Sequence, residues 1–214
     1  MRIKDDSFNV EAKKATILEL NDLLSQPSDF TERPCPGCRF ATPDGKTDSS
    51  STKFCSYRCE AAPRQMSGEP DRFPIETKVV PVVYAFYTLR KLMPCWSCEG
   101  HLDGHENLSK LPKVWFYSTS NFYPKLISQA LSQMEGKKLL VNGWIVRILP
   151  FSQSMYTITY SLEPSALTNQ KTDRLVLNSL HSDMVVIADD LRRDVFRLAM
   201  DYVNKGAKSP FNLG

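Results

Sequence analysis

The chain has 214 residues, of which 42% are hydrophobic and 24% are charged. These proportions are typical of a folded globular protein, and they exclude collagen-like, coiled-coil and wholly disordered chains. The 27 basic and 24 acidic side chains give a net charge of +3, a balance too even for a protein that holds nucleic acid or a membrane by a broad charge field. Any anionic partner must therefore be bound at a local site.

The N-terminal residues do not resemble a secretory signal. Two acidic residues, Asp5 and Asp6, stand where such a signal needs an apolar stretch, and the longest apolar-rich run, 79–86, is too short to span a membrane. We therefore expect a cytoplasmic protein with no membrane partner. In that compartment the six cysteines are expected to be thiols or metal ligands rather than disulfides.

The first third of the chain predicts a helix followed by a segment that cannot fold alone. Residues 10–25 place most of their apolar side chains on one helical face, with Asn9 as N-cap and Pro27 as a stop. From 27 to 74 the chain is rich in Pro, Gly, Ser, Asp and Thr, and it holds four of the six cysteines. With so little apolar area, this segment requires a bound metal to be stable.

The middle of the chain alternates between helical and strand patterns. The spacing predicts a helix over 77–92, a strand over 112–118 and a helix over 121–135. The dipeptide Asn142-Gly143 lies between two β-prone runs, and such a pair predicts a β-hairpin with a type I′ turn. These patterns indicate a sheet whose strands are mostly close neighbours in the sequence.

The end of the chain predicts one strand and one long helix. Residues 154–164 alternate in polarity as a strand does, and 173–205 have helical periodicity. The pattern leaves open a break near His181. The order of elements predicts an α+β fold with a mainly antiparallel sheet covered by helices, plus a small treble-clef-like zinc module. We divide the chain into an N-terminal helix (1–30), a four-cysteine zinc-binding module (31–72) and an α+β domain (73–214).

Two cysteine pairs define the predicted zinc module. They form a CxxC motif, sixteen intervening residues and a CxxxC motif, made by Cys35, Cys38, Cys55 and Cys59. Four thiolates are what tetrahedral structural zinc takes. A redox role for the dithiols and a metal-free module stay open as alternatives.

The second half of this segment, Phe54-Cys55-Ser56-Tyr57-Arg58-Cys59, resembles the FCS-x-R-C half of treble-clef zinc fingers. The resemblance covers about residues 33–64, and it implies a fold for the module rather than an activity. Because four thiolates offset most of the positive charge of the module, phosphate binding is a weaker prospect than docking to a protein partner. The apolar contacts would come from Phe40, Phe54 and Tyr57.

A second cluster gathers the other two cysteines and two of the three histidines between 95 and 105. One hypothesis is a second zinc site with the ligands Cys95, Cys98, His101 and His105, in the pattern C-x2-C-x2-H-x3-H. A packed turn without chemistry is also open, because a free cysteine is often just a small buried hydrophobe.

The favoured hypothesis for 97–105 is a reactive or ligand-binding loop. Cys98 would be a nucleophile, Glu99 an acid or base, and His101 a base or metal ligand. Around it, Arg90, Lys91, Lys110 and Lys113 could attract an anion such as RNA or a phosphorylated metabolite, although solvated helix and loop ends look the same. The nearby aromatic set is Trp96, Trp115, Phe116 and Tyr117, and part of it could stack a base, since alternate residues of a strand point to opposite faces.

The motif VPVVYAF...SCEGH...VWFYS resembles a pattern in uncharacterised bacterial proteins. It is also distantly similar to the Ser-Cys-x-Gly-Arg loop and following Trp-containing strand of the tRNA wybutosine-synthesis methyltransferase family, whose arginine is His101 here. The resemblance covers about 77–120, and it implies that residues 97–101 form a site. No glycine-rich G-x-G-x-x-G loop is present.

These patterns predict a zinc-containing protein that acts through the 97–105 loop on an anionic substrate, and nucleic-acid-derived molecules are among the candidates. The alternative is a non-catalytic zinc adaptor whose finger and N-terminal helix bind a protein partner. The sequence does not decide whether the protein is an enzyme, and it predicts no oligomeric state.

Overall fold

The computed structural model describes residues 8–25, 62–89, 91–118, 120–150, 158–165 and 173–207. The four cysteines of the predicted zinc module lie outside these residues, as do positions 154–157 of the predicted last strand. Within the described residues the fold is α+β, as the sequence predicts, with a mainly antiparallel sheet and helices packed on it.

The main sheet has four antiparallel strands in the order β1-β4-β6-β5. Their bounds are β1 Leu92–Cys98, β4 Lys113–Ser118, β5 Trp144–Ile148 and β6 Ile158–Pro164. A two-stranded hairpin, β2 His101–Leu102 with β3 Leu108–Lys110, continues from the end of β1. The strand that carries the two later cysteines is therefore an edge strand.

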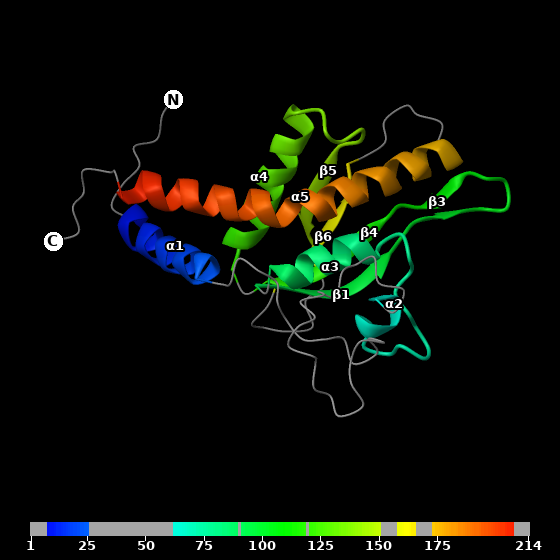
Figure 1. The fold of residues 1–214 in the computed structure, drawn as a ribbon, viewed down its shortest axis with the longest axis horizontal. Coiled ribbons are helices and arrows are strands. Elements are labelled where there is room, and N and C mark those ends of the chain that lie inside the picture. The colour runs from blue at the N-terminus through cyan, green and yellow to red at the C-terminus, as the bar shows by residue number, and fades with distance from the viewer. Residues whose placement is uncertain are drawn as a thin grey trace, which may run out of the picture.

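The described helices are α1 Phe8–Leu24, α2 Ala62–Gln65, α3 Val80–Thr88, α4 Phe122–Gly136 and α5 Arg174–Ala207. Helices α3 and α4 pack against the sheet, and the long helix α5 packs on both of them (Figure 1). Alternate residues of the central strands point toward the helices, so that Val114, Phe116 and Leu162 are buried in the core. Helix α1 packs against α5, and its Leu20 and Leu23 join the same core.

Helix α5 runs without a break through His181. Its buried apolar residues recur every three or four positions, as at Leu180, Met184, Ile187 and Leu191, and they face the core from end to end. Because the apolar stripe is continuous, packing provides no reason for the helix to bend. None of the described helices combines the length and apolar character that a membrane crossing requires.

The hairpin predicted at Asn142-Gly143 is wrong. Residues 138–141 form no strand, and β5 pairs instead with β6, whose described part begins at Ile158. The side chain of Asn142 is buried and donates to Asp183 of α5, at 2.8 Å. The turn residue is thus held by a distant carboxylate rather than used in a two-residue hairpin loop.

The reactive or ligand-binding loop expected over 97–105 is only partly a loop, because Ser97 and Cys98 belong to β1 and His101 and Leu102 form β2. Strand β1 includes Pro94, and a proline cannot donate to a β-ladder. At the edge of a sheet that missing donor costs little, and a register shift between Pro94 and Trp96 adapts the strand to it.

Candidate metal centre

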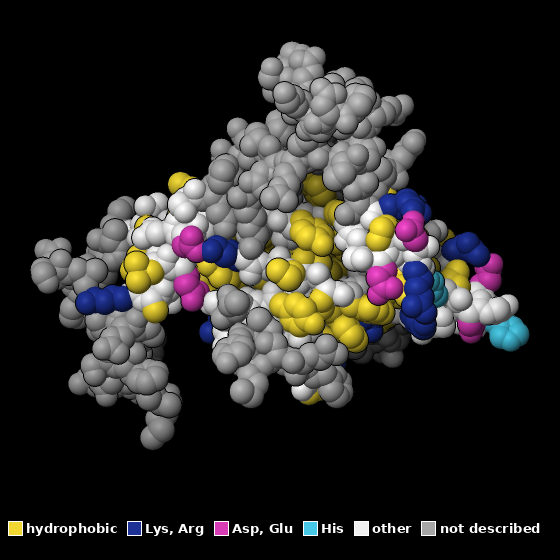
Figure 2. Space-filling model, turned by 90° about the horizontal axis from the view of Figure 1, so that it is seen from below, with side chains coloured by type: hydrophobic (Ala, Val, Ile, Leu, Met, Phe, Trp, Pro, Cys, Tyr) yellow, Lys and Arg dark blue, Asp and Glu magenta, His cyan; other side chains and the backbone are white. Residues whose placement is uncertain are grey.

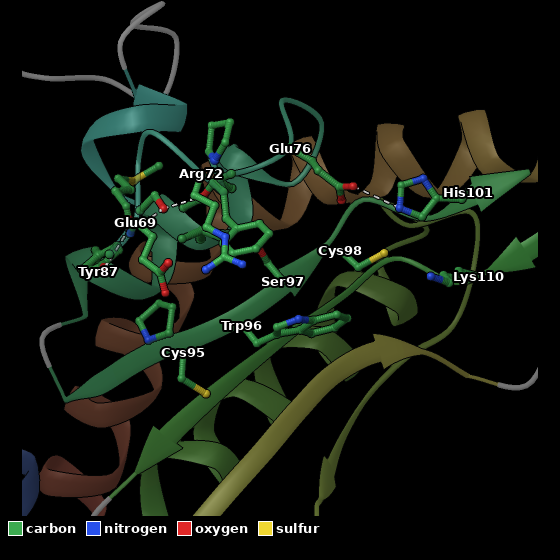
Figure 3. A pocket seen from close by; sticks show the side chains of 18 residues that line it. Glu69, Arg72, Glu76, Tyr87, Cys95, Trp96, Ser97, Cys98, His101 and Lys110 are labelled. Atoms are coloured by element: carbon green, nitrogen blue, oxygen red, sulfur yellow. Dashed lines mark hydrogen bonds and ion pairs between the residues drawn. The ribbon is translucent and has the colours of Figure 1, made fainter.

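A cleft of about 870 Å³ lies between the 66–76 segment and strand β1 (Figure 3). Glu69, Arg72 and Glu76 line it from the segment, while Trp96 and Cys98 line it from β1. Its far end is formed by the β2–β3 hairpin, with His101 and Lys110. The segment and the strand are brought together because Met66 and Ile75 pack against the core.

Three side chains converge at this end of the cleft: Glu76, Cys98 and His101. One ligand atom from each of them lies within 4.8 Å of the other two. Glu76 Oε1 is 3.0 Å from His101 Nε2, and the Cys98 side chain is buried while the other two are half-buried. A carboxylate, a thiol and an imidazole at such separations could hold a metal ion.

The chain reaches this arrangement by a tight turn after β1. The backbone N–H of Glu99 donates to Glu76 Oε2 at 2.7 Å, and that of Gly100 donates to Cys98 Sγ at 3.4 Å. Gly100 has a φ of +88°, in the left-handed region that favours glycine. The turn directs the chain back so that His101, the first residue of β2, faces Glu76.

Glu99 holds the turn through both its carboxylate and its backbone carbonyl. Its Oε2 accepts a hydrogen bond from the backbone N–H of Lys78 at 2.8 Å, and its carbonyl oxygen is 2.8 Å from His181 Nε2. Its side chain belongs to no group of potential metal ligands among the described residues. The role expected for Glu99 as an acid or base therefore stays a prediction, and the contacts it makes hold the turn in place.

The four ligands of the hypothesised second zinc site are not brought together. Cys98 and His101 meet, but among the described residues Cys95 and His105 join no group of potential metal ligands. Cys95 lies exposed at the register shift of β1. His105 lies exposed in the turn between β2 and β3, where its backbone N–H donates to Asp103.

Sequence analysis missed Glu76 as a member of the site. It stands 22 residues before Cys98 and outside the cysteine-histidine cluster, so no ligand-spacing pattern links them. Its position follows from the packing of the 66–76 segment along β1, which is a tertiary contact.

Partial removal from water sets the direction in which the pKa of each of the two thiols departs from its ordinary value. Desolvation raises the pKa of Cys98 above its ordinary value, and desolvation also raises the pKa of Cys95. Without a metal, both thiols are therefore mostly protonated at neutral pH and are weak nucleophiles. A bound metal ion reverses this, because a coordinating thiol is deprotonated outright.

Comparisons with family models, with curated proteins and with solved structures find no match to this chain. The treble-clef and methyltransferase resemblances therefore stay predictions.

Proposed function

We propose that the protein is a zinc-dependent enzyme that hydrolyses an anionic substrate in the cleft, with Glu76, Cys98 and His101 as the metal ligands. The observation that carries this proposal is the convergence of three ligand atoms of different side chains within 4.8 Å at the wall of an open cleft. An isolated structural site would have no need of the adjoining cavity.

The donor set favours zinc over the other common ions. Thiolate and imidazole are ligands that Zn²⁺ takes readily, whereas Mg²⁺ and Ca²⁺ select oxygen. Structural zinc sites are normally closed by four protein ligands, while catalytic ones have three and keep a position open for water or substrate. Three protein ligands facing a cleft match the second kind.

The side chains around the cluster suit an anionic substrate. Arg72 and Lys110 line the cleft, and neither forms an ion pair within the part of the chain that the structure describes. When bound, zinc would supply a Lewis acid and a water of lowered pKa. Glu76 and His101 would fix the ion at the wall, and Arg72 and Lys110 would bind and orient the anionic group of the substrate.

We also propose a structural zinc held by Cys35, Cys38, Cys55 and Cys59, on the spacing of their two motifs. The protein purified without added metal is then expected to contain two zinc ions per chain. Elemental analysis of the Cys98→Ser/His101→Ala double variant should show one zinc, and Cys35→Ser should lose the other.

The matched control for the cleft site is His105→Ala, because His105 is a nearby exposed histidine that belongs to no ligand group of the described residues. It should retain both ions. A double variant with the same zinc content as the wild type would refute the metal site of the cleft, whatever the content of the four-cysteine module.

Catalysis requires its own measurement, for which bis(p-nitrophenyl) phosphate is a suitable anionic ester. Hydrolysis should stop when a chelator removes zinc, return when zinc is added, and fall at least about 100-fold in His101→Ala, because loss even of groups that merely support a metal ligand costs 10–100-fold. Stoichiometric zinc at the cleft without hydrolysis of phosphate esters would favour the non-catalytic adaptor.

A further inference from the structure

Trp96 forms an aromatic wall of the same cleft, two residues before Cys98 on β1 (Figure 3). Trp96 is 45% exposed, so much of its indole surface is open to solvent. Figure 2 shows hydrophobic side chains gathered on the face seen from below, bordered by charged ones. An exposed indole at the wall of a cleft offers a flat surface to a ligand.

The indole of Trp96 is supported from the neighbouring strand. Trp96 pairs with Trp115 of β4 across the sheet, and the two ring centroids are 4.5 Å apart with an interplanar angle of 39°. Trp115 is half-buried in a strand that is paired on both sides. The Trp96 ring is therefore held in place before any ligand arrives, which lowers the entropy cost of stacking on it.

The strand fixes how this surface lies relative to the metal ligands. Side chains two residues apart on a strand share a face and are about 7 Å apart, and the pairing between β1 and β4 is regular from Trp96 to Cys98. A ligand with a flat ring on Trp96 can thus extend its other end toward Cys98 and His101. Arg72 and Lys110 line the same cleft and are available to an anionic group at that end.

We propose that the substrate class is a nucleotide, whose base stacks on Trp96 while its phosphate faces the metal ligands and the two cations. This inference rests on the proposed function, since it uses the metal end of the cleft as the phosphate end. In a nucleotide, a sugar separates the flat base from the anionic phosphate. That arrangement matches the separation in the cleft between Trp96 and the metal ligands. The cleft volume of about 870 Å³ lies within the range of small-molecule sites.

The test compares ligands with and without the base. With the zinc-loaded full chain, AMP and CMP should each bind more tightly than ribose 5-phosphate, by isothermal titration calorimetry. Trp96→Leu should weaken AMP about tenfold, which is the loss expected for one base stacked on an aromatic side chain, and should leave ribose 5-phosphate unchanged. Trp96→Phe should recover most of the affinity.

The matched control is Met93→Ala, because Met93 is an exposed apolar residue of the same strand that does not line the cleft. It should leave AMP binding unchanged.

Nucleotides that bind no better than ribose 5-phosphate, or a Trp96→Leu variant that weakens both ligands equally, would overturn the inference while leaving the zinc site intact. AMP binding that depends on Trp96 but persists in the Cys98→Ser/His101→Ala variant would instead retain the base site and reject the metal site. The same titration with a pentanucleotide in place of AMP distinguishes the two sources of the ligand, which are the end of a nucleic-acid strand and a free nucleotide.

Discussion

Replacing Asp183 with alanine is expected to lower the free energy of unfolding by about 4 kcal/mol, since each buried donor left unsatisfied costs about 1–3 kcal/mol and the losses are not fully additive. The carboxylate is 1% exposed. It accepts hydrogen bonds from the backbone N–H groups of Val141 and Asn142, the side-chain amide of Asn142 and the indole N–H of Trp144. Alanine would leave four donors beside a cavity.

Urea denaturation followed by circular dichroism measures this change, with the dependence on urea concentration expected to stay the same. Asp183→Asn should cost roughly half as much, because one oxygen remains as an acceptor. Asp201 of the same helix is exposed and pairs with Arg197, so Asp201→Ala should cost less than about 0.5 kcal/mol. Equal losses for Asp183→Ala and Asp201→Ala would contradict the structural role of the buried carboxylate.

The same carboxylate explains where the sequence prediction of the fold stopped. The helices over 121–135 and 173–205 and the strand over 112–118 are set by local periodicity, and the structure confirms them. The turn at Asn142 is set by a hydrogen bond to a residue 41 positions later. A dipeptide signal reports only on local backbone preference, and here a buried tertiary contact outweighs it.

The candidate site divides in the same way. The density of cysteine and histidine in the sequence indicated Cys98 and His101, and these two side chains do meet. Glu76 completes the group from a segment that reaches β1 only through packing. Cys95 and His105 had the right residue types and spacing, but β1 and the hairpin place them apart from the cluster. The spacing of cysteine and histidine in the sequence predicts metal ligands that lie on one loop. This group is instead assembled from a strand, a turn and a distant segment.

Helix α5 connects the site to the core. His181 Nε2 lies 2.8 Å from the carbonyl oxygen of Glu99. Arg174 forms an ion pair, at 2.8 Å, with Glu106 in the turn of the β2–β3 hairpin. Both residues lie in the first third of α5, and this helix packs on α1, α3 and α4. The turn that positions Cys98 and His101 is therefore attached to a rigid element, as a metal site with fixed geometry requires.

Gly100→Ala should damage stability and zinc binding together. At a φ of +88°, an added Cβ would lie 2.8 Å from Pro112 Cδ and 2.9 Å from Leu177 Cδ1. A left-handed backbone costs an L-residue about 1–2 kcal/mol and overpacking costs about 1–3 kcal/mol, so we expect a loss of about 3 kcal/mol in the free energy of unfolding. The Leu177 side chain can yield, but the left-handed backbone and the contact with the Pro112 ring are relieved only by movement of the turn, which separates Cys98 from His101 and Glu76.

Gly104→Ala is the control, because Gly104 lies in the same hairpin segment with no atom within 4 Å of an added Cβ. It should leave the unfolding free energy and the zinc content unchanged. Urea denaturation and elemental analysis of the two variants therefore separate the role of the turn from a general effect of alanine in the hairpin. The contrary outcome is a Gly100→Ala protein that is less stable but still holds zinc at the cleft. The ion would then not depend on the Glu99-Gly100 turn. In that case Glu76, Cys98 and His101 would be rejected as its joint ligands.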